Sequence, residues 1–247
     1  MVDSLHTLES GPMSVTSLKL PPEARRLDSS PLSEHVYQVI RDAICDGVIK
    51  EHDHLVQNHL AEQLEVSRTP VRDALLRLAQ EGLVRAVSAR GFVVNALTPS
   101  DILEIYEVRT FLEIPGSISA IPFITDRHVA RMEEINRGIA ASPVGASIAY
   151  DLNRDFHAVL LEIGTNRLIQ RTLADLWELP VSRRVFRHHV TNQFDAEAMA
   201  NGHLAIIEAV AMRSEERLRA ALLAHLVEAR EEASTWLTAD ALVAGKP

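Results

Sequence analysis

Residues 66–78 have the sequence VSRTPVRDALLRL, which joins a polar opening to an apolar stripe. The stripe consists of Val71, Ala74, Leu75 and Leu78. Spacings of three and four residues predict the buried face of an α-helix. Pro70 falls in the first turn, where a missing backbone N–H is harmless, and Ser67 or Thr69 is placed to cap the helix.

The flanking sequence predicts the rest of a small domain. Helical spacing runs from Leu32 to Gly47, with Ser33 as the expected N-cap. The other expected elements are a short helix at residues 59–64 and, after Gly82, strands at 83–87 and 92–94 joined by a turn at 88–91. Three helices and a β-hairpin predict a winged helix-turn-helix over residues 31–98.

The second helix of such a motif enters the DNA major groove, and its N-terminal residues meet the bases. The residues expected there are Ser67, Arg68, Thr69 and Arg72. Arg68 and Arg72 share a helix face, and arginine is suited to reading guanine or clamping phosphate. Arg90 and Gly91, at the expected hairpin tip, suit a wing that approaches the minor groove. Alternatively, the arginines only solvate a helix surface, but the ordered set favours DNA binding.

From Pro99 onward, every strong period in the sequence is helical. The expected helices lie near residues 100–120, 125–141, 146–164, 166–189 (disturbed at Pro180), 194–212 and 214–238, with Ser100, Thr125, Asn166 and Ser214 as N-caps. Six consecutive helices predict an antiparallel bundle over residues 99–240. Residues 1–30 are expected to form a disordered arm and residues 241–247 a tail. The expected fold class is therefore mainly α.

The charge distribution agrees with a DNA-binding module joined to a different kind of domain. The net charge of the chain is −9, which argues against a general nucleic-acid binder. Residues 66–98, however, hold five arginines against two acidic residues, whereas residues 99–247 hold 15 basic and 21 acidic residues. A small basic module attached to an acidic helical body accounts for this asymmetry.

Cysteine content and hydropathy indicate the compartment. Cys45 is the single cysteine of the chain, so no intramolecular disulfide forms. No apolar run approaches the roughly 20 residues needed to cross a bilayer, and the N-terminus lacks the pattern of a signal peptide. These features predict a soluble, cytoplasmic protein without a membrane partner.

Three histidines of the acidic half lie on apolar helix stripes. They are His157, His203 and His225, and each belongs to a different expected helix. Imidazoles that converge inside the bundle could bind zinc or a related divalent ion. Alternatively, they are three unrelated histidines at the edge of the core.

Arg109 is expected to point inward, because Ile102, Ile105 and Leu112 share its helix face. A buried guanidinium needs a partner. That partner is either an internal acid such as Glu113 or the carboxylate of a small organic ligand.

The N-terminal motif resembles the DNA-binding domain of the GntR family of bacterial transcription regulators. The resemblance rests on Leu60-Ala61, on residues 66–75, on Glu81-Gly82-Leu83-Val84 and on Arg90-Gly91-Phe92-Val93-Val94. It implies a transcription regulator that binds double-stranded operator DNA. A homodimer is expected, because one recognition helix reads only a few base pairs whereas a two-fold dimer reads two half-sites.

Residues 100–238 resemble the FCD-type effector domain of the FadR branch of that family. The motifs are Tyr106-Glu107-Val108-Arg109, Leu112-Glu113, residues 153–157, Gly164-Thr165-Asn166, His203 and His225-Leu226. The resemblance implies a divalent metal, zinc or nickel-like, held by the three histidines, with Asn153 where many members have an aspartate. It also implies that Arg109 anchors a small carboxylate effector. Six helices would indicate the VanR-like subgroup.

The resulting hypothesis is a ligand-responsive repressor, released by a small organic acid, rather than an enzyme. One alternative is a metal sensor, in which the ion itself is the signal. A metal-dependent hydrolase is disfavoured, because the site offers no recognisable general base and a basic winged domain has no role in hydrolysis.

Overall fold

The computed structural model describes residues 32–88, 91–143, 147–193 and 196–244. It divides the chain into two compact units, Met1–Ala96 and Leu97–Pro247. The arm expected at residues 1–30 lies outside the described residues, and so does Arg90 of the expected wing tip.

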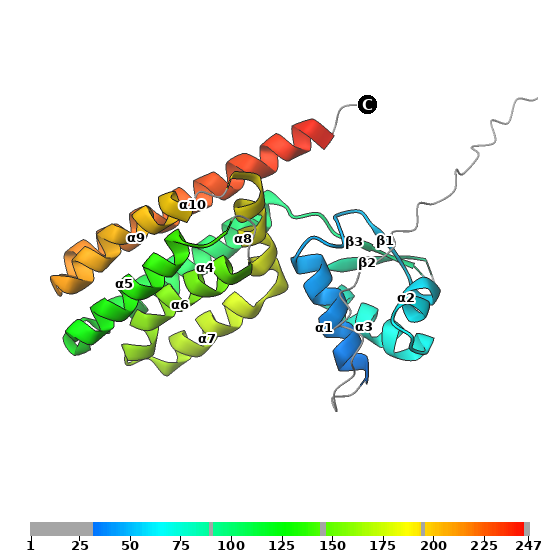
Figure 1. Ribbon diagram of the computed structural model, residues 1–247, viewed down its shortest axis with the longest axis horizontal. Helices are drawn as coiled ribbons and strands as arrows, with labels where there is room; N and C mark the ends of the chain where they lie inside the picture. The colour runs from blue at the N-terminus through cyan, green and yellow to red at the C-terminus, as the bar shows by residue number, and fades with distance from the viewer. Residues whose placement is uncertain (1–31, 89–90, 144–146, 194–195, 245–247) are drawn as a thin grey trace, which may run out of the picture. The chain divides into compact units, whose positions relative to one another are not determined.

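The N-terminal unit contains three helices and a three-stranded antiparallel sheet (Figure 1). Its elements are α1 (Leu32–Cys45), β1 (His54–Val56), α2 (Gln57–Gln63), α3 (Arg68–Gln80), β2 (Val84–Ser88) and β3 (Gly91–Val94). The strand order is β1-β3-β2, so the predicted hairpin gains an unpredicted edge strand. Strand β1 has only three residues, too few to show alternation, and forms because His54 to Val56 pair with Val93 to Gly91.

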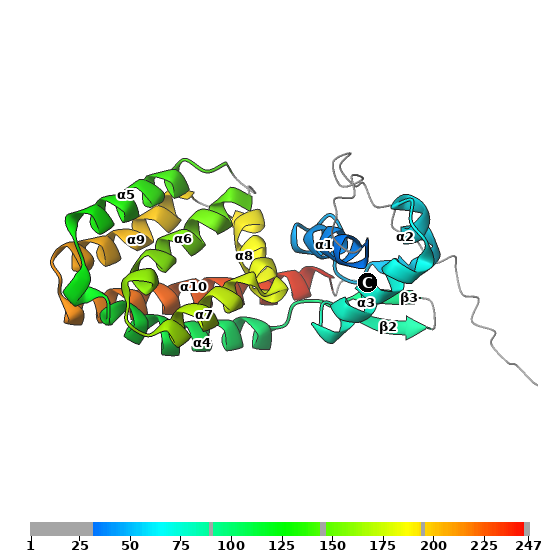
Figure 2. The same ribbon diagram turned by 90° about the horizontal axis from the view of Figure 1, so that it is seen from below.

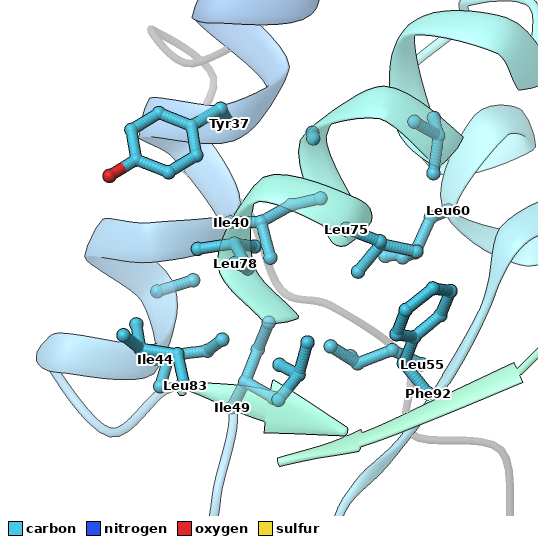
Figure 3. Packing of buried hydrophobic residues seen from close by; sticks show 14 of the residues in the cluster. Tyr37, Ile40, Ile44, Ile49, Leu55, Leu60, Leu75, Leu78, Leu83 and Phe92 are labelled. Atoms are coloured by element: carbon cyan, nitrogen blue, oxygen red, sulfur yellow. The ribbon is translucent and has the colours of Figure 1, made fainter. Parts of the chain in front are cut away.

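The core of this unit lies between the helices and the sheet (Figure 3). The predicted apolar stripe of α3 is fully buried there. Ile40 and Ile44 of α1 pack against Leu75 and Leu78 of α3, and Phe92 closes the sheet side. The packing of one apolar stripe against another holds α3 in place and leaves its opposite face exposed.

Residues with positive φ make the tight connections of this unit. Gly47 ends α1 at φ +69° and its N–H donates to Ile44 O at 3.1 Å, as predicted. Gly82 has φ +77° between α3 and β2. Glu65 has φ +56° in the turn between α2 and α3, where a glycine would adopt the same conformation without a steric cost.

The C-terminal unit is a helical bundle (Figures 1 and 2). Its α-helices are α4 (Pro99–Ile118), α5 (Asp126–Ala140), α6 (Ser147–Ile163), α7 (Arg167–Glu178), α8 (Pro180–Gln193), α9 (Ala196–Ala211) and α10 (Glu215–Ala244), with a 3-10 turn, η2, at Ile121–Phe123. Helix α4 packs against α7 and α10, α5 against α6 and α9, and α9 against α10. No helix among the described residues is long and apolar enough to span a membrane.

The described part of the bundle has seven α-helices, so the prediction of six was wrong. The helix expected at 166–189 is divided into α7 and α8 at Leu179, which is extended at ψ 131°. A residue before proline avoids the helical region, and Pro180 then begins the next helix. The prediction of the VanR-like subgroup rested on six helices, so it loses its support.

Two further boundaries differ from the expectation. Thr98, not Ser100, caps α4: the hydroxyl of Thr98 accepts from Asp101 N at 3.2 Å, and the Asp101 carboxylate accepts from Thr98 N at 2.7 Å. Helix α10 continues to Ala244, into the expected tail. The predicted cap at Asn166 is confirmed, because its side chain accepts from Leu168 N and Ile169 N. Ser33 lies inside α1 rather than at its cap.

Candidate nucleic-acid interface and metal centre

The N-terminus of α3 presents a polar, basic surface. Ser67, Arg68, Thr69 and Arg72 are all exposed there, while Pro70 and Val71 are buried beneath them. Ser67 is the N-cap residue, but its hydroxyl makes no cap hydrogen bond. The structure thus brings together the four residues predicted on this helix. Gly91 begins β3, in register with Val56 and Ser88.

Arg77, near the end of the same helix, has a different role from Arg68 and Arg72. Its guanidinium pairs with Glu34 of α1 at 2.5 Å and with Glu81 at 3.2 Å, and it lies over the Tyr37 ring at 3.6 Å. The Tyr37 hydroxyl donates to Glu81 at 2.8 Å. These contacts tie α3 to α1 and orient the basic surface.

The three predicted metal-ligating histidines converge in the C-terminal unit. His157 of α6, His203 of α9 and His225 of α10 each offer a ring nitrogen, and these nitrogens lie within 4.8 Å of one another. His157 and His203 are buried, and His225 is partly buried. Imidazoles from three helices at this spacing can surround one divalent ion.

The hydrogen-bond partners of two of these rings leave the Nε2 atoms available. His203 Nδ1 lies 3.0 Å from Asn136 Oδ1, and the amide orientation follows because Asn136 Nδ2 donates to Ala200 O at 2.9 Å. His157 Nδ1 contacts Glu113 Oε1. Both partners are acceptors, so both rings carry their proton on Nδ1 and an Nε2 lone pair. Within the described structure, the buried Nε2 atoms of His157 and His203 have no hydrogen-bond partner. Two orphaned lone pairs beside a third imidazole fit a metal ion.

Glu113 is the residue of this site that sequence reasoning identified only in part. Its position one helical turn from Arg109 indicated an ion pair, and Arg109 Nε does donate to Glu113 Oε2 at 3.1 Å. Its second contact, to His157 on α6, depends on how α4 and α6 pack and left no signal in the sequence.

Burial and charge set the protonation of the cluster. Burial alone would raise the pKa of Glu113, but the charge of Arg109, together with the contacts from His157 and Arg109, outweighs burial and holds that pKa below its usual range. Burial lowers the pKa of His157 in spite of the opposing Glu113 carboxylate. Burial, with smaller effects from His225 and His157, places the pKa of His203 well below its usual range. Neutral imidazoles at neutral pH are the form that binds metal.

Arg109 is buried, as predicted, and lies beside this cluster with one nitrogen that lacks an acceptor. Its guanidinium lies 4.4 Å from the Trp177 ring, and its buried Nη2 has no hydrogen-bond partner within the described structure. A cavity of about 20 Å³ lies beside Arg109 and is also lined by Trp177 and Ser182. That volume holds about one water molecule. Asn153, also predicted as a ligand, is buried on α6 one turn before His157.

Comparison with known families agrees with both units. The model of "Bacterial regulatory proteins, gntR family" matches residues 32–94, and the FCD domain model matches residues 104–228. The chain therefore belongs to the GntR family of regulators that carry an FCD domain. It is a DNA-binding transcription regulator, not an enzyme.

Named relatives extend over most of the chain. An uncharacterised HTH-type regulator, YdhC of Bacillus subtilis, is 27% identical over 79% of this chain and 88% of its own length. The HTH-type transcriptional repressor RspR of Escherichia coli is 25% identical over 85% and 95%. The solved structure of a putative GntR regulator from Rhodococcus has a TM-score of 0.64 at 24% identity, covering 81% of this chain and 96% of that one, which shows the shared fold.

Proposed function

We propose that this regulator is a homodimeric repressor that a small organic acid releases from its operator, and that the acid binds beside a divalent metal. The observation that carries the proposal is the juxtaposition, inside one bundle, of three convergent imidazoles and a buried, incompletely paired guanidinium. The metal would supply a positive Lewis-acid centre for the acid. Operator binding also implies action in the cytoplasm.

The metal is proposed to be zinc or a nickel-like ion, because buried neutral imidazoles prefer such ions over calcium or magnesium. His157, His203 and His225 would hold it, with Asn153 as a weaker fourth ligand. An amide oxygen adds no charge of its own, so Asn153 is expected to contribute less than an aspartate would.

The size of the cavity beside Arg109 indicates how an effector would act. About 20 Å³ is too small for an organic acid, so binding requires a more open bundle. An effector that binds only the open form shifts the population toward it. This differential affinity is the physical basis proposed for a change in operator binding.

An exposed apolar face of α4 supports the proposed homodimer. Leu103, Val108 and Phe111 lie on it, and Phe111 is 74% exposed. Helix α7 runs antiparallel beside α4, since Gly116 approaches Ile169 and Arg109 lies over Trp177. Two copies paired antiparallel through α4 would bury the apolar face between them.

Exposed charges on and beside this face are complementary in such a pairing. Glu104 and Glu107 are exposed toward the start of α4. Arg167 and Arg171 are exposed on the half of α7 that lies beside the end of α4. Antiparallel pairing brings the acidic end of one copy to the basic end of the other, which favours this register.

The experiment is to measure operator affinity on a DNA site selected by the protein itself. It is repeated after metal removal, after metal return, and with a panel of small carboxylates. Loss of operator binding only when acid and metal are both present supports the proposal. A response to metal alone would instead favour the metal sensor, and a response to neither would overturn both readings.

A further inference from the structure

Glu113 is a buried carboxylate with two partners of different kinds. Its Oε2 accepts from Arg109 Nε at 3.1 Å, and its Oε1 contacts His157 Nδ1. The side chains of Glu113 and His157 are each 1% exposed, and that of Arg109 is 7% exposed. One side chain therefore joins the proposed effector anchor to a proposed metal ligand.

We propose that Glu113 is a positioning residue that makes metal affinity depend on the state of Arg109. The inference rests on the metal site of the proposed function. A ligating imidazole that donates its other N–H to a carboxylate is held in orientation and becomes a stronger donor to the metal. Arg109 forms an ion pair with the same carboxylate, so Arg109 and His157 compete for the negative charge of Glu113.

Competition of this kind couples two ligands. An anion that binds Arg109 neutralises part of its charge and leaves the Glu113 carboxylate more available to His157, which strengthens metal binding. By thermodynamic linkage, the metal then strengthens anion binding by the same factor. The buried, unpartnered Nη2 of Arg109 gives an incoming anion a donor without first breaking the Glu113 contact.

Comparison with His203 shows that the charge of Glu113 does more than orient the ring of His157. Asn136 Oδ1 approaches His203 Nδ1 at 3.0 Å, so a neutral amide orients that ring. The amide nitrogen of Asn136 donates to the backbone oxygen of Ala200 and so makes no contact with a cation. Orientation alone thus does not require a carboxylate. The carboxylate of Glu113 adds a link to Arg109 that Asn136 does not make in the described contacts.

The test is a Co²⁺ and Zn²⁺ titration of the full-length protein, with affinity read by chelator competition and geometry by the Co²⁺ absorption spectrum. Glu113→Gln should weaken metal binding by about 10- to 100-fold. Arg109→Gln should tighten it, because Glu113 loses its other partner, whereas Arg109→Lys should stay near wild type. In a Glu113→Gln background, Arg109→Gln should lose most of its effect.

Glu162→Gln is the matched control, since Glu162 is an exposed carboxylate paired with Arg131 at 2.8 Å, and it should leave metal affinity unchanged. If Glu113 only supports the fold, Arg109→Gln and Glu113→Gln should both weaken metal binding. That result would overturn the coupling. Equal metal affinities of the wild-type and Glu113→Gln proteins would also overturn the coupling, but not the metal site itself. If the wild-type protein binds no metal, both the coupling and the metal site of the proposed function are overturned. If Glu113→Gln does not fold, unequal Arg109→Gln and Arg109→Lys affinities sustain the coupling and equal ones overturn it.

Discussion

The exposed arginines of α3 and the buried histidines of the bundle lie in opposite surroundings, and these surroundings suit the different roles proposed for them. Arg68 and Arg72 are exposed, without an ion pair in the described structure, so their donors are available for the DNA contacts proposed for them. His157 and His203 are buried with one ring nitrogen engaged and the other unpartnered. Exposure preserves a charge for a polyanion, while burial keeps an imidazole neutral for a metal.

Arg72→Ala should lower affinity for the selected operator by about 1–3 kcal/mol if Arg72 reads a base. The loss should be larger on operator than on random DNA, and fluorescence anisotropy over a salt series measures both. Arg219→Ala, an exposed arginine of α10, is the control and should bind normally. Normal operator binding by the Arg68→Ala/Arg72→Ala protein would contradict the assignment.

His225→Ala should lose most of the bound metal, because it removes one of three strong ligands. Asn153→Asp should tighten binding, because it brings a negative charge to the position one turn before His157. Elemental analysis of untagged, dialysed protein measures both effects. His128→Ala, which removes a histidine outside the cluster, should retain the metal.

The metal-free protein should lose stability on acidification. The pKa values of His157 and His203 are lowered in the folded state, so below about pH 6.5 the unfolded chain binds more protons. Stability is therefore full above that pH and falls below it, by up to about 1.4 kcal/mol per pH unit for each histidine. Urea melts in chelator at pH 5.5 and 7.5 test this. A His203→Gln protein with an equally steep fall would contradict the assignment to His203.

At the level of elements, short connections determine where the functional side chains lie. The turn after α3 sets the start of β2, and the break at Leu179 separates α7 from α8. The side chain of Asn95 donates to Gly82 O at 2.7 Å and reinforces the first of these. Backbone conformation at single residues therefore sets the placement of whole elements.

Gly82→Ala should destabilise the protein by about 1–2 kcal/mol, because Gly82 has φ +77° and an L side chain is strained there. Apart from the two neighbouring residues, no heavy atom of the described structure lies within 4 Å of an added Cβ, so the loss reports backbone strain alone. Gly82→Asn should lose less, since asparagine tolerates this conformation better. Denaturant melts compare the three proteins, and equal stability of the alanine variant would refute the argument.

At the level of the whole molecule, the N-terminal unit carries the recognition helix and the C-terminal unit carries the histidine cluster. A single recognition helix reads few base pairs, whereas a two-fold dimer reads two half-sites and multiplies specificity. The C-terminal unit contains both the histidine cluster and the exposed apolar residues of α4 through which pairing is proposed. In the proposed homodimer, a ligand in the bundle would alter DNA binding by changing the geometry of the pair.

Phe111→Glu should convert the protein to a monomer in sedimentation at micromolar concentration and weaken operator binding, because it places a charge in the proposed apolar interface. Leu204→Glu is the control: Leu204 is 53% exposed on α9, outside the proposed interface, and its variant should remain dimeric. A dimeric Phe111→Glu protein would place the interface elsewhere.

Periodicity and residue chemistry alone predicted the winged helix-turn-helix and the helical class of the second unit, and they placed His157, His203 and His225 on apolar helix stripes. That the three histidines converge was implied by the resemblance to the FCD domain. These features depend on local spacing, because side chains three or four residues apart share a helix face whatever surrounds them. The division of α7 from α8, the strand β1 and the contact from Glu113 to His157 needed the folded structure. The contacts of β1 and Glu113 join residues about 35 or more positions apart, and packing between elements brings them together. The ion pair of Arg109 with Glu113 follows from their spacing on one helix, whereas only the packing of the bundle shows that Arg109 Nη2 is buried and has no hydrogen-bond partner within the described structure.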